Sequence, residues 1–102
     1  MTTTFVNKLR NAVQNGQILW NKHSFERMLE RGILRKDVKE AILKGEVIEN
    51  YPDDKPYPTA LILGWVRKNS LHVVAALDEN NDICYVITAY YPDEKHFEPD
   101  FK

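Results

Sequence analysis

His23, Arg27 and Arg31 recur at every fourth position of the chain. On a helix, residues four apart lie along one face, so this spacing gathers one titratable ring and two guanidinium groups in a single stripe. Because guanidinium groups bind phosphate oxygens in pairs, the stripe indicates a phosphate site with Arg27 and Arg31 as ligands. The competing interpretation is a solvated helix face on which Glu26 and Glu30 neutralise the two arginines.

A second histidine, His72, is the single polar side chain in the apolar run of residues 71–77. A three-residue turn with Asn81 in the left-handed conformation places His72 directly opposite Thr88, with Tyr90 on the same face. A ring, a hydroxyl and a phenol together are proton donors and acceptors, which general acid–base catalysis requires. The competing interpretation is structural, with His72 hydrogen-bonded to Thr88 and no chemistry at the site.

The neighbours of His72 depend on this hairpin register, because a slip of one residue turns every side chain to the other face of the sheet. The three-residue turn puts Cys84 on the face of His72 and Tyr85 on the face that packs against helices. A two-residue turn would instead place His72 with Ala89 and Ile87. We prefer the first register because it segregates the polar side chains.

The elements that position these residues follow from the apolar periodicity and from the glycines and prolines. Helices are predicted over residues 4–14, 22–31 and 34–44, and residues 17–20 are predicted to be an extended link. Strands are predicted over residues 46–50, 59–66, 71–78 and 83–90. This order, about three N-terminal helices followed by a mostly antiparallel meander of three or four strands, is an α+β fold.

Length and composition set the broad class of protein. A chain of 102 residues, 43% hydrophobic and 28% charged, is expected to form a single domain over residues 1–102. Within it we expect an N-terminal helix (1–16), a core (17–90) and a surface tail (91–102). The lone Cys84 excludes an internal disulfide and a multi-cysteine metal site. With no signal peptide or membrane-spanning run evident, a cytoplasmic location and no membrane partner are expected.

The net charge of −1 hides an asymmetry between two halves of the chain. Residues 1–45 carry nine Lys or Arg and four acids, or +5, and residues 46–102 carry five and eleven, or −6. This is not the strongly basic chain of a protein that binds nucleic acid by charge alone. The balance favours a local anion site at most.

The sequence contains no motif for several other classes of functional site. There is no glycine-rich phosphate loop, dinucleotide fingerprint, HExxH motif or nucleophile elbow, so we expect no cofactor and no metal. Four aromatic side chains could stack on nucleic-acid bases, although core packing and loop anchoring explain them equally well. These are Trp20, Tyr51, Tyr57 and Trp65.

An ordered series of short motifs resembles a known family over about residues 17–95. The motifs are Trp20-Asn21-Lys22-His23, Glu26-Arg27-Met28, Glu30-Arg31-Gly32-Ile33, Asp37-Val38, Gly45-Glu46, Tyr51-Pro52, Leu71-His72-Val73-Val74 and Ile87-Thr88-Ala89-Tyr90-Tyr91-Pro92. Together they resemble the bacterial family catalogued as domain of unknown function 4258. The chain departs from that pattern at Leu34, where the family often has a capping Ser or Thr, and this departure touches no proposed site.

The resemblance implies a function as well as a fold. The family resembles small RelE- and BrnT-like ribonuclease toxins, in which helices precede an antiparallel sheet, and its members can lie beside antitoxin-like partners. It therefore implies a metal-independent endoribonuclease toxin, with RNA as substrate and an antitoxin as protein partner. Carried over by position, the family's polar pattern falls on His23, Arg27, His72, Thr88 and Tyr90. Arg31 belongs to a helix-ending motif, for which a structural role fits at least as well as phosphate binding.

The chemistry of metal-independent RNA cleavage assigns a part to each of these residue types. The reaction needs a base for the 2′-hydroxyl proton, an acid for the leaving 5′-oxygen and positive charge on the phosphorane. His72 or His23 could be base or acid, Arg27 with Arg31 could hold the phosphate, and Tyr90 could stack on a base or donate a proton. The alternative is a non-catalytic module that binds a protein or nucleic acid through its basic helical half or a sheet edge.

Overall fold

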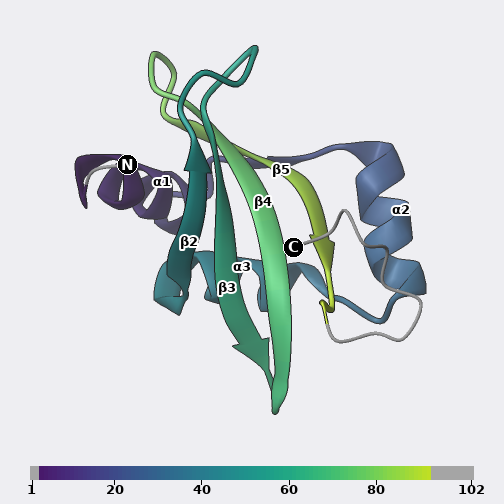
Figure 1. Ribbon diagram of the computed structural model, residues 1–102. Coiled ribbons are helices and arrows are strands. Elements are labelled where there is room, and N and C mark those ends of the chain that lie inside the picture. The colour runs from purple at the N-terminus through teal and green to yellow at the C-terminus, as the bar shows by residue number, and fades with distance from the viewer. Residues whose placement is uncertain (1–2, 93–102) are drawn as a thin grey trace.

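The computed structural model describes residues 3–92 of the chain (Figure 1). In this range the helices are α1 (Thr3–Gln14), α2 (Lys22–Glu30) and α3 (Arg35–Lys44). The strands are β1 (Ile18–Trp20), β2 (Glu46–Tyr51), β3 (Thr59–Val66), β4 (Asn69–Asp78) and β5 (Ile83–Tyr90). The α+β class and every predicted helix and strand are confirmed. Most of the predicted surface tail, from residue 93 onward, lies outside the described residues.

The five strands form one mixed sheet in the order β1-β5-β4-β3-β2. Strands β2 to β5 form the predicted antiparallel meander, whereas β1 pairs with β5 in parallel, with Ile18 opposite Cys84. The prediction of three or four strands is therefore corrected to five. A three-residue strand is too short to show the alternation of a half-buried strand, so the sequence indicated only an extended link there.

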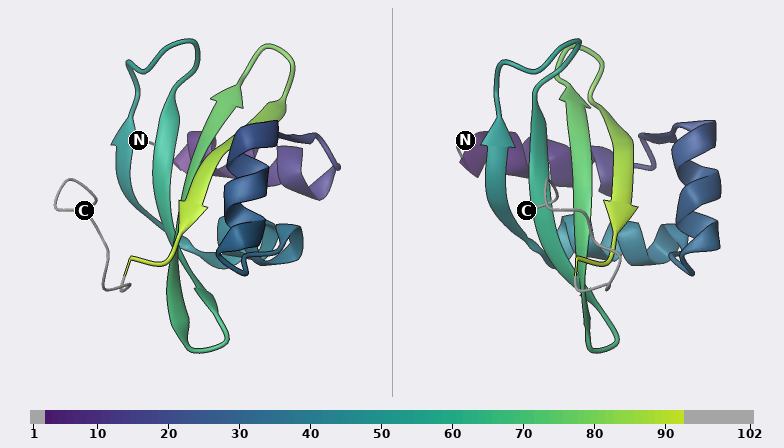
Figure 2. Two further views of the ribbon diagram at one scale, coloured as in Figure 1. Left: turned by 90° about the vertical axis from the view of Figure 1, so that its right-hand side faces the viewer. Right: turned by 45° about the vertical axis from the view of Figure 1, so that its right-hand side comes forward.

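Helices α1 and α3 lie on one face of the sheet, and α2 lies beside β5 (Figures 1 and 2). The core between these layers includes Leu9 of α1, Ile42 of α3 and Val73 of β4, all at most 1% exposed. Helix α3 packs directly on the backbone of β3, because a Cβ at Gly64 would lie 2.4 Å from the Cβ of Ala41. The face of the sheet opposite α1 and α3 is called the outer face below.

Local sequence determines both ends of α2, the helix that carries the predicted phosphate stripe. The side-chain oxygen of Asn21 accepts a hydrogen bond from the backbone N–H of Ser24 at 3.1 Å, which caps the first turn. Gly32 follows the helix with a φ of 75°, a left-handed conformation that favours glycine. Met28 is fully buried, so α2 is anchored in the core by the side away from its charged residues.

The turn between β4 and β5 differs from the predicted one. It contains four residues, 79–82, and the left-handed residue is Asp82 (φ 56°) rather than Asn81. Cys84 consequently lies opposite Leu77 and faces the helices, where it is fully buried. The prediction that Cys84 shares the face of His72 is wrong, because an even number of turn residues exchanges the faces of β5 relative to the predicted odd number.

A β-bulge in β5 then changes the register a second time. The pairing with β4 jumps from Val86 to Thr88, so Ile87 is an extra residue on β5. Beyond the bulge His72 lies opposite Tyr90, and the predicted pairing of His72 with Thr88 is wrong. The predicted sharing of one face by His72, Thr88 and Tyr90 is nevertheless confirmed, because the extra residue turns the end of β5 back to that face.

Candidate functional site

His72 and Tyr90 face each other across β4 and β5 on the outer face. The Nδ1 atom of His72 lies 3.4 Å from the hydroxyl oxygen of Tyr90, and the ring planes are inclined by 69°. The side chain of His72 is only 7% exposed, and Tyr90 is half-buried. Thr88 lies on the same face, opposite Val74. The sheet therefore gathers three of the five residues predicted to be catalytic.

Glu49 and Tyr51 of β2 add two further polar groups to the outer face. The hydroxyl of Tyr51 donates a hydrogen bond to a carboxylate oxygen of Glu49. This bond is the main cause of a raised pKa at Tyr51. A carboxylate that acts on two phenols extends the set of proton donors and acceptors on this face. Glu49 was not singled out from the sequence, and Tyr51 was named there only as an aromatic side chain that could stack on bases.

A second β-bulge explains why Glu49 faces outward. Val47 pairs with Ile62, whereas Glu49 pairs with Leu61, so Ile48 is an extra residue on β2. Without it, Glu49 would lie on the side of the helices. The sequence departs from regular alternation here, because two apolar residues, Val47 and Ile48, stand next to each other, and this doublet is the one local sign of the bulge.

The electrostatic environment of Tyr90 keeps its phenol protonated. Burial raises the pKa of Tyr90 above its ordinary value of 10.0, and the negative charge of Glu49 raises it further. Tyr90 is thus a hydrogen-bond donor at neutral pH rather than a base. A neutral imidazole, in contrast, has one ring nitrogen that can accept a proton. The two side chains in contact are therefore suited to opposite parts in a proton-transfer reaction.

Helix α2 is bound to the edge of β5 beyond the point where β1 ends. The hydroxyl of Ser24 donates to the backbone oxygen of Ile87 at 2.6 Å, and Nη1 of Arg31 donates to that of Ala89 at 2.9 Å. These two bonds satisfy carbonyl groups at and beyond the bulge, which an edge strand otherwise leaves unpaired. Arg31 therefore has a structural contact, in keeping with its place in a helix-ending motif.

The remaining members of the predicted stripe are not joined to the outer face. Within residues 3–92, the side chains of His23 and Arg27 are exposed and make no hydrogen bond or ion pair. In the same range, Glu26 and Glu30 form no ion pair with either arginine of the stripe. The guanidinium of Arg27 is consequently free to bind an anion that approaches the β5 edge.

A pocket of about 560 Å³ lies at the other end of β5, between β1 and the loop that precedes β3. Tyr57 of that loop stacks on Tyr85, with parallel rings 5.4 Å apart. Tyr85 was predicted to face the helices, but its partner on β4 is Ala76 of the outer face. Trp20 and Lys55 also line the pocket, which is mostly apolar with one cation at its wall.

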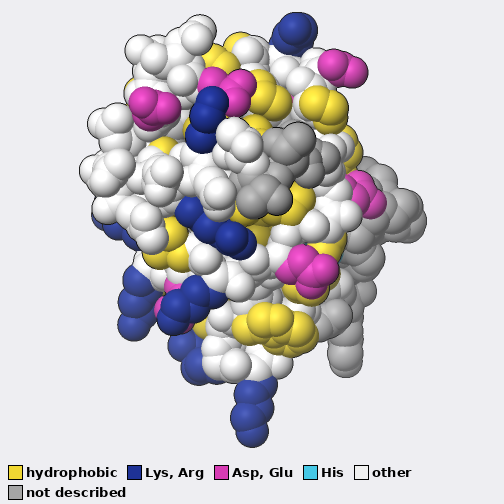
Figure 3. Space-filling view, turned by 90° about the vertical axis from the view of Figure 1, so that its left-hand side faces the viewer, with side chains coloured by type: hydrophobic (Ala, Val, Ile, Leu, Met, Phe, Trp, Pro, Cys, Tyr) yellow, Lys and Arg dark blue, Asp and Glu magenta, His cyan; other side chains and the backbone are white. Residues whose placement is uncertain are grey.

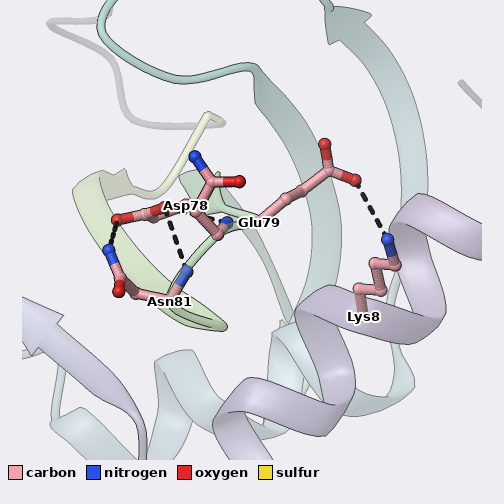
Figure 4. A network of polar contacts seen from close by, with 5 residues as sticks. Lys8, Asp78, Glu79 and Asn81 are labelled. Carbon is pink, nitrogen blue, oxygen red and sulfur yellow. Dashed lines mark hydrogen bonds and ion pairs between the residues drawn. The ribbon is translucent and has the colours of Figure 1, made fainter.

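The turn between β4 and β5 is held by Asp78 (Figure 4). Its carboxylate accepts hydrogen bonds from the backbone N–H groups of Asn80 and Asn81 and from the side-chain amide of Asn81 at 2.9 Å. The bonds from Asn81 lower the pKa of Asp78 below its ordinary value. Next to it, an ion pair of 3.5 Å between Glu79 and Lys8 ties the turn to α1. These groups stabilise the hairpin that carries His72 and Tyr90.

Three further findings concern the described residues only. No group of three His, Cys, Asp or Glu side chains within residues 3–92 is arranged to hold a metal ion. Burial raises the pKa of the Cys84 thiol to about 12, so Cys84 is a core side chain rather than a nucleophile. Among the helices of the same range, none has the length and apolar character needed to span a membrane.

The fold and the outer face define a small α+β domain that carries a histidine–tyrosine pair on a mixed sheet. A family model described as Domain of unknown function (DUF4258) matches residues 20–91, and the chain belongs to this family. The matched range begins at the last residue of β1 and ends just after β5, so it contains α2, α3 and strands β2 to β5 but not α1. No curated protein and no solved structure matches the chain.

Proposed function

We propose that this protein is a metal-independent endoribonuclease of the RelE/BrnT-like toxin type, with its active site on the outer face beside α2. The observation that carries the proposal is the contact of 3.4 Å between Nδ1 of His72 and the hydroxyl oxygen of Tyr90, an imidazole and a protonated phenol on one sheet face. On this proposal the substrate is RNA, the protein acts in the cytoplasm and an antitoxin protein is its partner.

In the proposed cleavage of RNA, each side chain of the site has one role. His72 takes the proton of the 2′-hydroxyl as its oxygen forms a bond to phosphorus, and the bond from phosphorus to the 5′-oxygen breaks. Tyr90 donates a proton to that leaving oxygen, and Thr88 donates a hydrogen bond to a phosphate oxygen. Arg27 supplies the positive charge that the pentavalent phosphorane requires. His23, in the first turn of α2, is the second candidate for the acid.

Cleavage of a labelled single-stranded RNA in the presence of EDTA tests this assignment. We expect cleavage by the wild-type protein, a loss of at least a hundredfold in His72→Ala, and smaller losses in Tyr90→Phe and Arg27→Ala. Lys39→Ala, which removes an exposed cation of α3, is the matched control and should cleave normally. Cleavage that is unchanged in both His72→Ala and Arg27→Ala would contradict the proposal.

The second candidate is a non-catalytic binding module, and the mostly apolar pocket beside β1 favours it. Leu19 and Ile87 at this pocket are 49% and 44% exposed, and apolar side chains clustered at a hollow are typical of a binding site. Salt-sensitive RNA binding without cleavage would favour this module over the enzyme. A large loss of stability in His72→Ala, with no ligand found, would instead indicate a purely structural polar cluster.

The toxin assignment has a separate test in cells. Expression of the wild-type protein should arrest growth, and co-expression of the neighbouring gene product should relieve the arrest. Growth unaffected by high expression of the wild-type protein would count against this assignment.

A further inference from the structure

Trp65 is an exposed aromatic side chain close to the His72–Tyr90 pair. It is 62% exposed, more than any other large apolar side chain within residues 3–92. Tryptophan is among the side chains that gain most from burial, so packing does not explain its position. Its neighbour Val66 is turned to the core and is 4% exposed, which leaves Trp65 as a lone ring at the end of β3.

The strand register places Trp65 on the same face as His72. Trp65 pairs with Ser70, and the next pair on that face is Leu63 with His72. Trp65 and His72 are therefore diagonal neighbours, a relation in which the two residues of an antiparallel pair lie about 7–8 Å apart and their Cβ atoms somewhat less. A flat ring at that distance from an acid–base pair lies within reach of a nucleotide adjoining the reacting one.

The turn that follows Trp65 carries two unneutralised cations. Arg67 and Lys68 connect β3 to β4, are exposed, and make no ion pair with any described residue. No acidic residue occurs between positions 59 and 77. Figure 3 shows basic side chains at the lower end of the molecule, the end at which this hairpin turns in Figure 1. The tip of the hairpin is thus locally positive although the chain as a whole is not.

We propose that Trp65, Arg67 and Lys68 form a binding site for single-stranded RNA, in which a base stacks on Trp65 and the two cations contact flanking phosphates. Base stacking on an exposed ring beside a basic track is the common chemistry of single-strand binding. A lipid surface fits less well, because interfacial binding needs a larger apolar area than one side chain. The choice of RNA and the direction of the strand toward His72 rest on the proposed function.

Binding of an RNA oligonucleotide with every 2′-hydroxyl methylated tests the site without cleavage. Fluorescence anisotropy of the labelled oligonucleotide should show binding about tenfold weaker in Trp65→Ala and near wild type in Trp65→Phe. Leu34→Ala, which removes another exposed apolar side chain, is the matched control and should bind normally. In the double variant Arg67→Ala/Lys68→Ala, the slope of log affinity against log salt should decrease by about 1.4.

The outcomes separate this inference from the proposed ribonuclease activity. Binding that depends on Trp65 in a protein that never cleaves RNA supports the site and contradicts the enzyme alone. Cleavage that depends on His72, with unchanged oligonucleotide binding in Trp65→Ala, overturns the site alone. Sedimentation with anionic phospholipid vesicles that requires Trp65, while oligonucleotide binding does not, would also overturn it in favour of a lipid surface.

Discussion

The two hydrogen bonds that attach α2 to β5 give a quantitative prediction about Arg31. Loss of the Ser24 bond in Ser24→Ala should cost about 1 kcal/mol of unfolding free energy. Loss of the Arg31 bond in Arg31→Met should cost about 1.5 kcal/mol, the low end for a charged donor, because the arginine is largely exposed. Methionine retains the apolar part of the arginine side chain, so packing is largely kept.

The double variant should lose roughly 2.5 kcal/mol, because the two residues are about 10 Å apart along the helix and share no partner. With a urea dependence of about 1–3 kcal/mol per molar, the unfolding midpoint should fall by about 0.8–2.5 M. Arg27→Met is the matched control, since Arg27 lies one turn earlier and its guanidinium makes no hydrogen bond or ion pair among the described residues. Urea unfolding followed by circular dichroism measures the wild-type protein and the four variants.

The same set of variants separates a structural arginine from one that binds phosphate. We expect Arg31→Met to lower stability, and Arg27→Met to lower RNA cleavage at unchanged stability. Equal stability of Arg31→Met and the wild type would refute the structural role of Arg31. An equal loss of stability in Arg27→Met would refute the argument that the bond to Ala89 is the cause.

Three further predictions concern groups elsewhere in the fold. The pKa of Tyr90 should lie above its ordinary value, and Glu49→Gln should lower it. Ultraviolet titration, with Tyr90→Phe as the reference that identifies the Tyr90 signal, measures this pKa. A pKa that is unchanged in Glu49→Gln would exclude the charge of Glu49 as a cause. The lowered pKa of Asp78 adds stability that is complete above the unfolded pKa near 3.9. That stability is lost as the pH falls through the pKa of Asp78 in the folded protein. In Asp78→Asn the free energy of unfolding should therefore depend less on pH in the acidic range. Gly64→Ala should lower stability by about 1–3 kcal/mol in urea unfolding, because the new methyl group meets Ala41; full stability would contradict that close packing.

The sequence predicts most elements of this fold because their signals are local. Amphipathic periodicity and the glycines at helix ends give the three helices, and runs of Val, Ile and Leu give β3 to β5. Strand β1 has no such signal, since three residues in parallel pairing with β5 depend on contacts far away in the chain. The long-range partner, rather than the segment itself, determines that it is a strand.

The candidate site could be predicted only in part, because two β-bulges, each made by one extra residue, determine which side chains share the outer face. Ile48 and Ile87 are the extra residues of the two β-bulges, and each reverses the facing of the side chains that follow it. The first turns Glu49 to the outer face, and the second returns Tyr90 to the face of His72. A bulge arises from the balance between strand pairing and packing on the core, which one-dimensional alternation does not contain.

The exposure of Trp65 could not be predicted either. A tryptophan in an apolar strand is ordinarily buried, and its place one pair beyond His72 follows from the β3–β4 register. The sequence indicates an aromatic residue near two cations, and the sheet indicates that the ring faces solvent.

The chemical nature of the RNA ends after cleavage shows whether the 2′-hydroxyl attacks the phosphate, as the proposed roles of His72 and Tyr90 require. An attack by the 2′-hydroxyl leaves a 2′,3′-cyclic phosphate on one fragment and a 5′-hydroxyl on the other, and mass spectrometry of a short RNA incubated in EDTA distinguishes these ends. We predict both ends with the wild-type protein, and neither with His72→Ala or with a substrate that has a 2′-deoxynucleotide at the cleaved position. Fragments with a 3′-hydroxyl and a 5′-phosphate, or an intact RNA after incubation with the folded wild-type protein, would contradict the account.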